Sequence, residues 1–188
     1  VQDLFPSARD YLDTYEEYGL LGARGVYGHS IHLMSREIDK LAEVGASVVH
    51  CPTSNTFIGS GLFDLMGLAK AQVGLGLASD VGGGSSFSML RTMAAAYEVA
   101  QLQGAAIHPA QLIWLATEGS AKALHLEGLI GKLSPGMEAD ICVLNLNSTS
   151  TINQRIKNAN SFWESLFPTI MMGDDRAVRQ VWVAGKAM

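Results

Sequence analysis

Three short apolar segments, each followed by a stretch with helical periodicity, limit most strongly how this chain can fold. They cover residues 25–29, 46–50 and 73–79, so a new unit begins about every 25 residues. Strands that alternate with helices at this spacing pair in parallel, because each helix crosses one face of the sheet. We therefore predict an α/β fold for this region. Helices are predicted over 8–18, 36–44, 62–71, 88–102, 109–118 and 120–125.

The number of predicted parallel strands leaves two architectures open. A closed (β/α)8 barrel needs eight strands and typically about 250 residues, so three strands can form only part of one. A small doubly wound sheet is the alternative, but the sequence lacks the spaced glycines of a dinucleotide-binding loop. The sequence therefore favours part of a barrel, and a small doubly wound sheet is the alternative.

The alternation of predicted strands and helices ends after residue 130. A turn-rich stretch leads into apolar alternation that no longer follows the strand–helix rhythm. We expect two regions, with the strand–helix units in 1–130 and part of a small β appendage in 131–188. In the second region, strands are predicted over 141–146 and 178–184, a polar loop over 147–161 and a short helix over 162–167.

Composition argues against several classes of partner. The net charge of −5 over 188 residues provides no basic excess for binding nucleic acid or an acidic membrane. No apolar run reaches the roughly 18 residues that a membrane helix needs.

Cys51 and Cys142 lie far apart in the sequence, which argues against a disulfide framework. We predict that both are reduced, mostly buried thiols of a cytoplasmic protein.

A carboxylate follows the most strand-like segment of the chain. Apolar and small residues alternate from Val73, no charge interrupts the run before Asp80, and Gly82, Gly83 and Gly84 follow at once. An acid at the C-terminal end of a buried strand, before a glycine turn, is typical of sites in α/β enzymes. The glycines are predicted to support a close approach of the backbone to such a site. The alternative is an N-cap for the next helix.

A histidine occupies the matching position two units earlier. His29 ends the first predicted strand, so parallel pairing would bring it to the same edge of the sheet as Asp80. Imidazole with carboxylate suits metal binding or proton transfer. We expect His50 and the following Cys-Pro-Thr-Ser-Asn turn to support the neighbouring loops. The other histidines, His32, His108 and His125, are interpreted as structural residues.

The number of candidate metal ligands is too small for a complete site. Catalytic zinc is usually held by three protein ligands and keeps one position open. The chain offers Asp80 and His29 but contains no His-x-His pair. We therefore expect that this chain alone does not complete a metal centre.

Five motifs in order resemble the C-terminal half of the guanine deaminase family, within the amidohydrolase superfamily. The resemblance covers nearly the whole chain, with Ser79 as a small departure from the Thr that is commoner before the Asp. The motifs are YGHSIHL at 27–33, HCPTSNTFIGSGLF at 50–63, VGLGLASDVGGGSSFSML at 73–90, GLIGKLSPGMEADICVLN at 128–145 and MGDDRAVRQVWVAGK at 172–186.

The resemblance implies a (β/α)8 barrel with a small β-sandwich and one Zn²⁺ per active site. In that family Asp80 matches the zinc ligand and base on the eighth strand. His29 matches the sixth-strand histidine, which contacts the metal-bound water or the forming oxyanion. Both residues would therefore be catalytic and would face the substrate. The His-x-His pair, the fifth-strand His, the catalytic Glu and the purine-binding Arg would lie before Val1.

The implied reaction is the hydrolytic deamination of guanine to xanthine and ammonia. A homodimer is implied for the full-length enzyme, and the isolated chain is expected to be an inactive fragment. Two alternatives stay open. The chain could belong to a related amidohydrolase that acts on another purine, a pterin or a triazine amine, or it could be a non-catalytic half-barrel.

Overall fold

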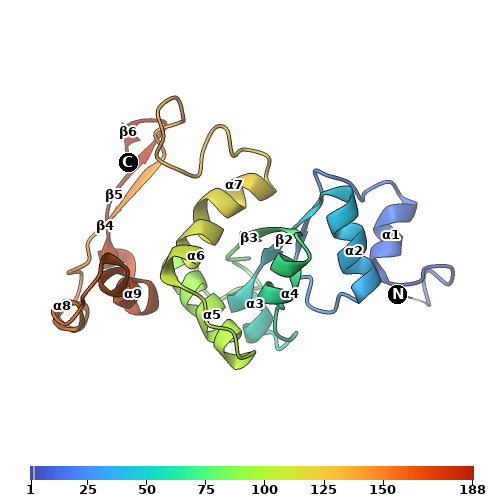
Figure 1. Cartoon of the computed structure of the whole chain (residues 1–188), viewed down its shortest axis with the longest axis horizontal. Coiled ribbons are helices and arrows are strands. Elements are labelled where there is room, and N and C mark those ends of the chain that lie inside the picture. The colour runs from blue at the N-terminus through green and yellow to red at the C-terminus, as the bar shows by residue number, and fades with distance from the viewer. Residues whose placement is uncertain (2) are drawn as a thin grey trace.

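The computed structural model describes Val1 and residues 3–188, and it confirms the predicted alternation of strands and helices (Figure 1). The N- and C-termini lie at opposite ends of the long axis. The elements of the first region are α1 (Tyr11–Glu17), β1 (Val26–Gly28), α2 (Ser35–Val44), β2 (Ser47–His50), α3 (Pro52–Phe57), α4 (Leu65–Lys70), β3 (Gly74–Leu77), α5 (Met89–Leu102), α6 (Pro109–Trp114), the π-helical turn Leu115–Gly119 and α7 (Ser120–Ala123).

The three predicted strands form one parallel sheet in the order β1-β2-β3. Val26 pairs with Ser47, and Val49 pairs with Gly76. The small residues of β3 allow close packing, because a Cβ on Gly76 would lie 3.3 Å from the Cα of Ser120. The Ser120 hydroxyl also accepts a hydrogen bond from the Leu77 N–H at 3.1 Å. The residues that begin α7 therefore pack directly on this strand.

The hydrophobic core lies between the parallel sheet and its crossover helices. Apolar side chains from the strands and from the inward faces of the helices pack there and exclude water, which is the main favourable contribution to folding. None of the helices formed by the described residues is long and apolar enough to cross a membrane. The central members of the core are Leu41, Val48, Leu68, Leu75 and Leu112.

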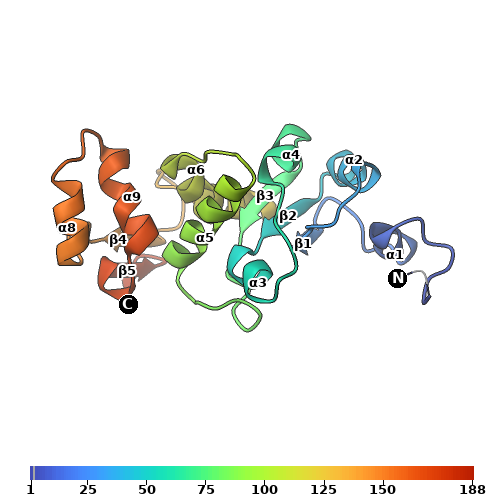
Figure 2. The same cartoon turned by 90° about the horizontal axis from the view of Figure 1, so that it is seen from below.

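The second sheet is antiparallel and lies at the other end of the molecule, with α5 and α6 between it and the parallel sheet (Figures 1 and 2). Its strand Ile141–Leu144 pairs with Val178–Val183, which also pairs with Lys186–Ala187. The prediction that Cys142 is mostly buried is wrong, because its side chain is exposed on the strand. The elements of this region are β4 (Ile141–Leu144), α8 (Ser150–Ile156), α9 (Phe162–Met172), the 3-10 turn Asp175–Ala177, β5 (Val178–Val183) and β6 (Lys186–Ala187).

Two predictions about loops are wrong, and one predicted helix is longer than expected. Residues 52–57 form the helix α3, with Pro52 favourably placed in its first turn. The predicted loop 147–161 contains α8, which Thr149 caps by accepting the Ile152 N–H. Burial of the Ile152 side chain then stabilises this polar helix. The predicted short helix over 162–167 continues to Met172.

A buried acid joins the first helix to the loop before α2. Glu37 is only 2% exposed. Its carboxylate accepts the Leu12 N–H at 3.0 Å and the Met34 N–H at 2.8 Å. The side chain thus satisfies two backbone donors, and leaving a buried donor unsatisfied costs free energy of folding.

We predict that Glu37→Ala lowers the free energy of unfolding by about 2–4 kcal/mol, because two backbone N–H groups lose their acceptor. Urea unfolding followed by circular dichroism measures the change. Glu43→Ala, on the same helix with a largely exposed side chain, is the matched control and should change stability by less than about 0.5 kcal/mol. Equal losses for the two variants would contradict the proposed role of Glu37.

Candidate functional site

The carboxyl ends of the three parallel strands meet at one edge of the sheet. His29 directly follows β1, and Asp80 lies three residues after the end of β3. The structure brings the two together, with His29 Nε2 3.7 Å from Asp80 Oδ2. Their side chains are 45% and 38% exposed, so both are accessible to a ligand. The sheet therefore places an imidazole and a carboxylate side by side at an open edge.

Both residues of this pair have a left-handed backbone. The φ angle is +65° at His29 and +46° at Asp80, and Ser30 follows at +49°. Such conformations cost a non-glycine residue of order 1–3 kcal/mol, and they persist only where the surrounding structure imposes them. The backbone at this edge is thus strained at both positions that the sequence singled out.

Helix α3 connects the two strand ends. The Asn55 Oδ1 lies 2.8 Å from His29 Nδ1, and the Thr53 hydroxyl donates to the Ser79 carbonyl at 3.2 Å. The prediction that the Cys-Pro-Thr-Ser-Asn segment supports its neighbours is confirmed, although the segment is a helix. Sequence reasoning did not single out Asn55. The only signal was its place just after a strand end.

His50 is buried inside the sheet edge. Its ring stacks on Phe63, with centroids 4.4 Å apart and planes inclined by 10°. Burial lowers the pKa of His50 to about 3, so the ring is neutral at physiological pH. Its Nδ1 has no hydrogen-bond partner among the described residues. This histidine therefore acts as an apolar packing group, and its supporting role stays a prediction.

Cys51 follows His50 and lies close to the pair. Its side chain is buried, and the thiol donates weakly to the Val49 carbonyl at 3.6 Å. Burial raises the pKa of the Cys51 thiol, and the charge of Asp80 acts in the same direction. A thiol that stays protonated is a poor metal ligand or nucleophile. Cys51 is therefore a packing residue at this edge.

The glycines after Asp80 are required by a tight turn. Gly82 has φ of +118°, which L-residues rarely adopt. A Cβ on Gly83 would lie 2.9 Å from Asp80 Oδ2 and 3.0 Å from the Ser54 hydroxyl, and one on Gly84 would collide with the Ser79 carbonyl oxygen. The glycines thus let the turn fold back against Asp80. Whether they also admit a ligand stays a prediction.

Two other histidines, His108 and His125, make contacts away from the pair. His32 lies with His29 among the residues that line one cavity. His108 caps α6 by accepting the Ala110 N–H, and the His125 Nε2 donates to the Ala23 carbonyl at 2.6 Å. Within Val1 and residues 3–188, no group of three or more His, Cys, Asp or Glu side chains could hold a metal ion. His29 and Asp80 fit part of a zinc site, since both types are zinc ligands, but two donors do not complete one.

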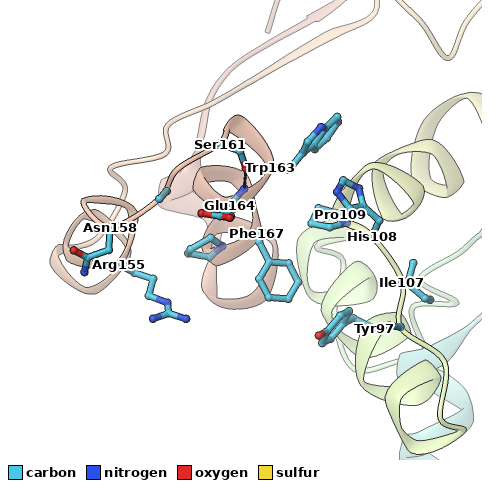
Figure 3. A pocket seen from close by; sticks show the side chains of 13 residues that line it. Tyr97, Ile107, His108, Pro109, Arg155, Asn158, Ser161, Trp163, Glu164 and Phe167 are labelled. Carbon is cyan, nitrogen blue, oxygen red and sulfur yellow. Dashed lines mark hydrogen bonds between the residues drawn. The ribbon is translucent and has the colours of Figure 1, made fainter.

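Among the cavities that open on the described residues are two large grooves. One groove of about 1050 Å³ runs along β1 from the tyrosines of α1 to His29. The other, of about 660 Å³, lies between α5 and α6 on one side and α8 and α9 on the other, with Tyr97, Phe167 and Trp163 among its walls (Figure 3). Of these two grooves, the one along β1 contains His29.

The chain matches one protein family and several known proteins. Residues 2–188 match the amidohydrolase family. The chain is 41% identical over 186 residues to guanine deaminase of Escherichia coli strain K12, covering 99% of this chain and 42% of that protein. The solved structure of E. coli guanine deaminase superimposes with a TM-score of 0.97 at 40% identity, covering 100% of this chain and 44% of the other. The chain thus spans less than half the length of this relative.

Two further solved structures carry bound groups. Guanine deaminase from C. acetobutylicum, with guanine bound in its active site, is 26% identical with a TM-score of 0.86 and covers 100% of this chain and 45% of that one. An adenosine deaminase from Xanthomonas campestris with bound zinc is 27% identical with a TM-score of 0.80, covering 94% and 39% of the two chains.

Because His50 is buried, we predict that the free energy of unfolding depends on pH. The folded-state pKa of about 3 lies below the ordinary 6.5, so between these pH values only the unfolded chain binds a proton at this residue. The free energy of unfolding should therefore fall as pH drops through this window, by up to about 1.4 kcal/mol per pH unit from His50. Urea unfolding at several pH values measures the slope, which His50→Leu should reduce.

Phe63→Leu is the matched control. It removes the stacked ring but keeps the imidazole, so stability should fall at every pH while the pH dependence remains. An unchanged slope in His50→Leu would show that the proton linkage arises elsewhere.

Proposed function

This chain belongs to the amidohydrolase family, and we propose that it supplies one part of the active site of a guanine deaminase. The observation that carries the proposal is the His29–Asp80 pair at the carboxyl edge of a parallel sheet. The substrate assignment is supported by the similarity to E. coli guanine deaminase and to the C. acetobutylicum structure with bound guanine. The reaction is the hydrolysis of guanine to xanthine and ammonia.

Asp80 and His29 are assigned complementary parts of this hydrolysis. Asp80 would hold a zinc ion, in keeping with the zinc-containing relative from Xanthomonas campestris. When bound, zinc supplies Lewis acidity that lowers the pKa of water. Asp80 accepts the proton of the water that attacks C2 of guanine. His29 faces the same attacking oxygen, and its ring stabilises the charge that is redistributed as this oxygen bonds to C2.

The rest of the site comes from a segment outside this chain. Two donors do not complete a zinc site, and the chain covers 42% of its curated relative. That segment would contribute the other zinc ligands, a proton-shuttling acid and the purine-binding groups. Residues 1–130 would then form part of a (β/α)8 barrel and residues 131–188 part of a β-sandwich, in an enzyme that acts as a homodimer.

We predict that a protein extended upstream of Val1 holds one zinc per chain and releases ammonia from guanine, whereas the present chain does neither. Metal analysis and an ammonia assay on both proteins measure this. In the extended protein, Asp80→Ala should abolish zinc retention and turnover, because the carboxylate is lost. Glu98→Ala, at an exposed position of α5, is the control and should retain both.

The outcomes separate the alternatives. Zinc binding and turnover by the short chain alone would contradict the incomplete site. Full zinc occupancy with normal turnover in Asp80→Ala would remove Asp80 from the site. A panel of guanine, adenine derivatives, pterins and triazines tests the substrate. Turnover of another amine but not guanine would place the protein elsewhere in the family.

We also predict that Gly83→Val in the extended protein lowers kcat/KM on the order of 100-fold, because the new side chain displaces the Asp80 carboxylate. Gly22→Val is the matched control, since a Cβ there has no neighbour within 4 Å. Steady-state kinetics with guanine give the comparison. If Gly83→Val matched the wild-type rate, the tight packing of this turn against Asp80 would have no functional role.

A further inference from the structure

One residue of α3 controls how the His29 ring is held. Asn55 is only 1% exposed, and its Oδ1 lies 2.8 Å from His29 Nδ1 across 26 residues of sequence. The same helix is tied to the end of β3 by the hydrogen bond from Thr53 to the Ser79 carbonyl. Asn55 is therefore fixed relative to both members of the His29–Asp80 pair.

The hydrogen bond from His29 to Asn55 determines which ring nitrogen carries the proton. An amide oxygen can only accept, so Nδ1 must be the protonated nitrogen of neutral His29. Nε2 is then an unprotonated nitrogen, and it faces Asp80 Oδ2 at 3.7 Å. The nitrogen that faces the reacting groups is thus able to accept a proton or to share one with the carboxylate.

We propose that Asn55 is a positioning residue that fixes the Nδ1–H tautomer and the orientation of His29. The assignment rests on the proposed function of the His29–Asp80 pair. Partners of this kind orient a histidine in many metal and catalytic sites, where they set the tautomer through the nitrogen that does not react. Asn55 itself touches neither water nor substrate in this scheme.

The cost of burying Asn55 supports a role beyond stability. Among the described residues its Nδ2 has no hydrogen-bond partner, and the neighbouring Ser54 hydroxyl has none either. Buried polar atoms without partners reduce the free energy of folding, so an apolar side chain would be the more stabilising choice here. An amide also provides an acceptor for Nδ1–H without adding a second negative charge beside Asp80.

The first test measures the tautomer in this chain and does not depend on catalysis. Long-range ¹H–¹⁵N NMR of histidine-labelled protein, with His29→Gln to assign the signal, reports which nitrogen of neutral His29 is protonated. We expect Nδ1–H in the wild type. Asn55→Ala should give a mixture of tautomers or the Nε2–H form, whereas Asn55→Asp keeps an acceptor oxygen and should retain Nδ1–H. Asn153→Ala, on the exposed side of α8, is the control.

The wild-type spectrum alone can overturn the proposal, since an Nε2–H tautomer is incompatible with it. Retention of pure Nδ1–H in folded Asn55→Ala would also overturn it. If Asn55→Ala does not fold, Asn55→Asp decides, because loss of the Nδ1–H form despite the retained oxygen would contradict the assignment. Circular dichroism establishes which variants are folded.

The second test uses the protein extended upstream. Asn55→Ala should lower kcat for guanine by roughly 10- to 100-fold with KM changed less than about threefold, because ring orientation matters in the transition state. Asn55→Asp should recover at least part of this loss. A change confined to KM would overturn the positioning role. If the wild-type protein does not deaminate guanine, the proposed function fails, while the NMR result still decides how Asn55 holds His29.

Discussion

The register of three parallel strands determines where every candidate functional side chain lies. Pairing of β1 with β2 and of β2 with β3 brings their carboxyl ends to one edge, so residues 51 positions apart in sequence become neighbours. A shift of one residue in either pairing would turn the strand side chains to the opposite face. The His29–Asp80 pair therefore depends on backbone hydrogen bonds and on the core beneath them, more than on any contact between the two side chains.

Several features of this edge lower the free energy of unfolding. The backbone is left-handed at His29, Ser30 and Asp80. The α3 residues Ser54 and Asn55 bury polar atoms that have no partner within the described part of the chain. The fully packed helices and sheet behind the edge offset these costs. Strain at the candidate site, held in place by a packed core, is what a pre-organised site requires.

The sequence predicted structure and site residues best where the local residue pattern matches the position of the segment in the fold. Alternation identified the strands, and Asp80 and His29 followed from their position at strand ends. The helix α3 was missed because Thr53, Ser54 and Asn55 are weak helix formers, and their helix depends on tertiary burial. The link from Asn55 to His29 joins different units, and no periodicity reports such a bond. The exposure of Cys142 reflects how β4 packs, which alternation alone does not determine.

The hydrogen bond between His125 and the Ala23 carbonyl has a consequence for folding kinetics. It closes a loop that contains the whole parallel sheet, since its partners are 102 residues apart. Contacts of such long sequence separation raise the contact order and carry a large entropy of closure, so they form late and slow the search for the native state. We expect this bond to form only after the sheet has assembled and to mark the final closure of the first region.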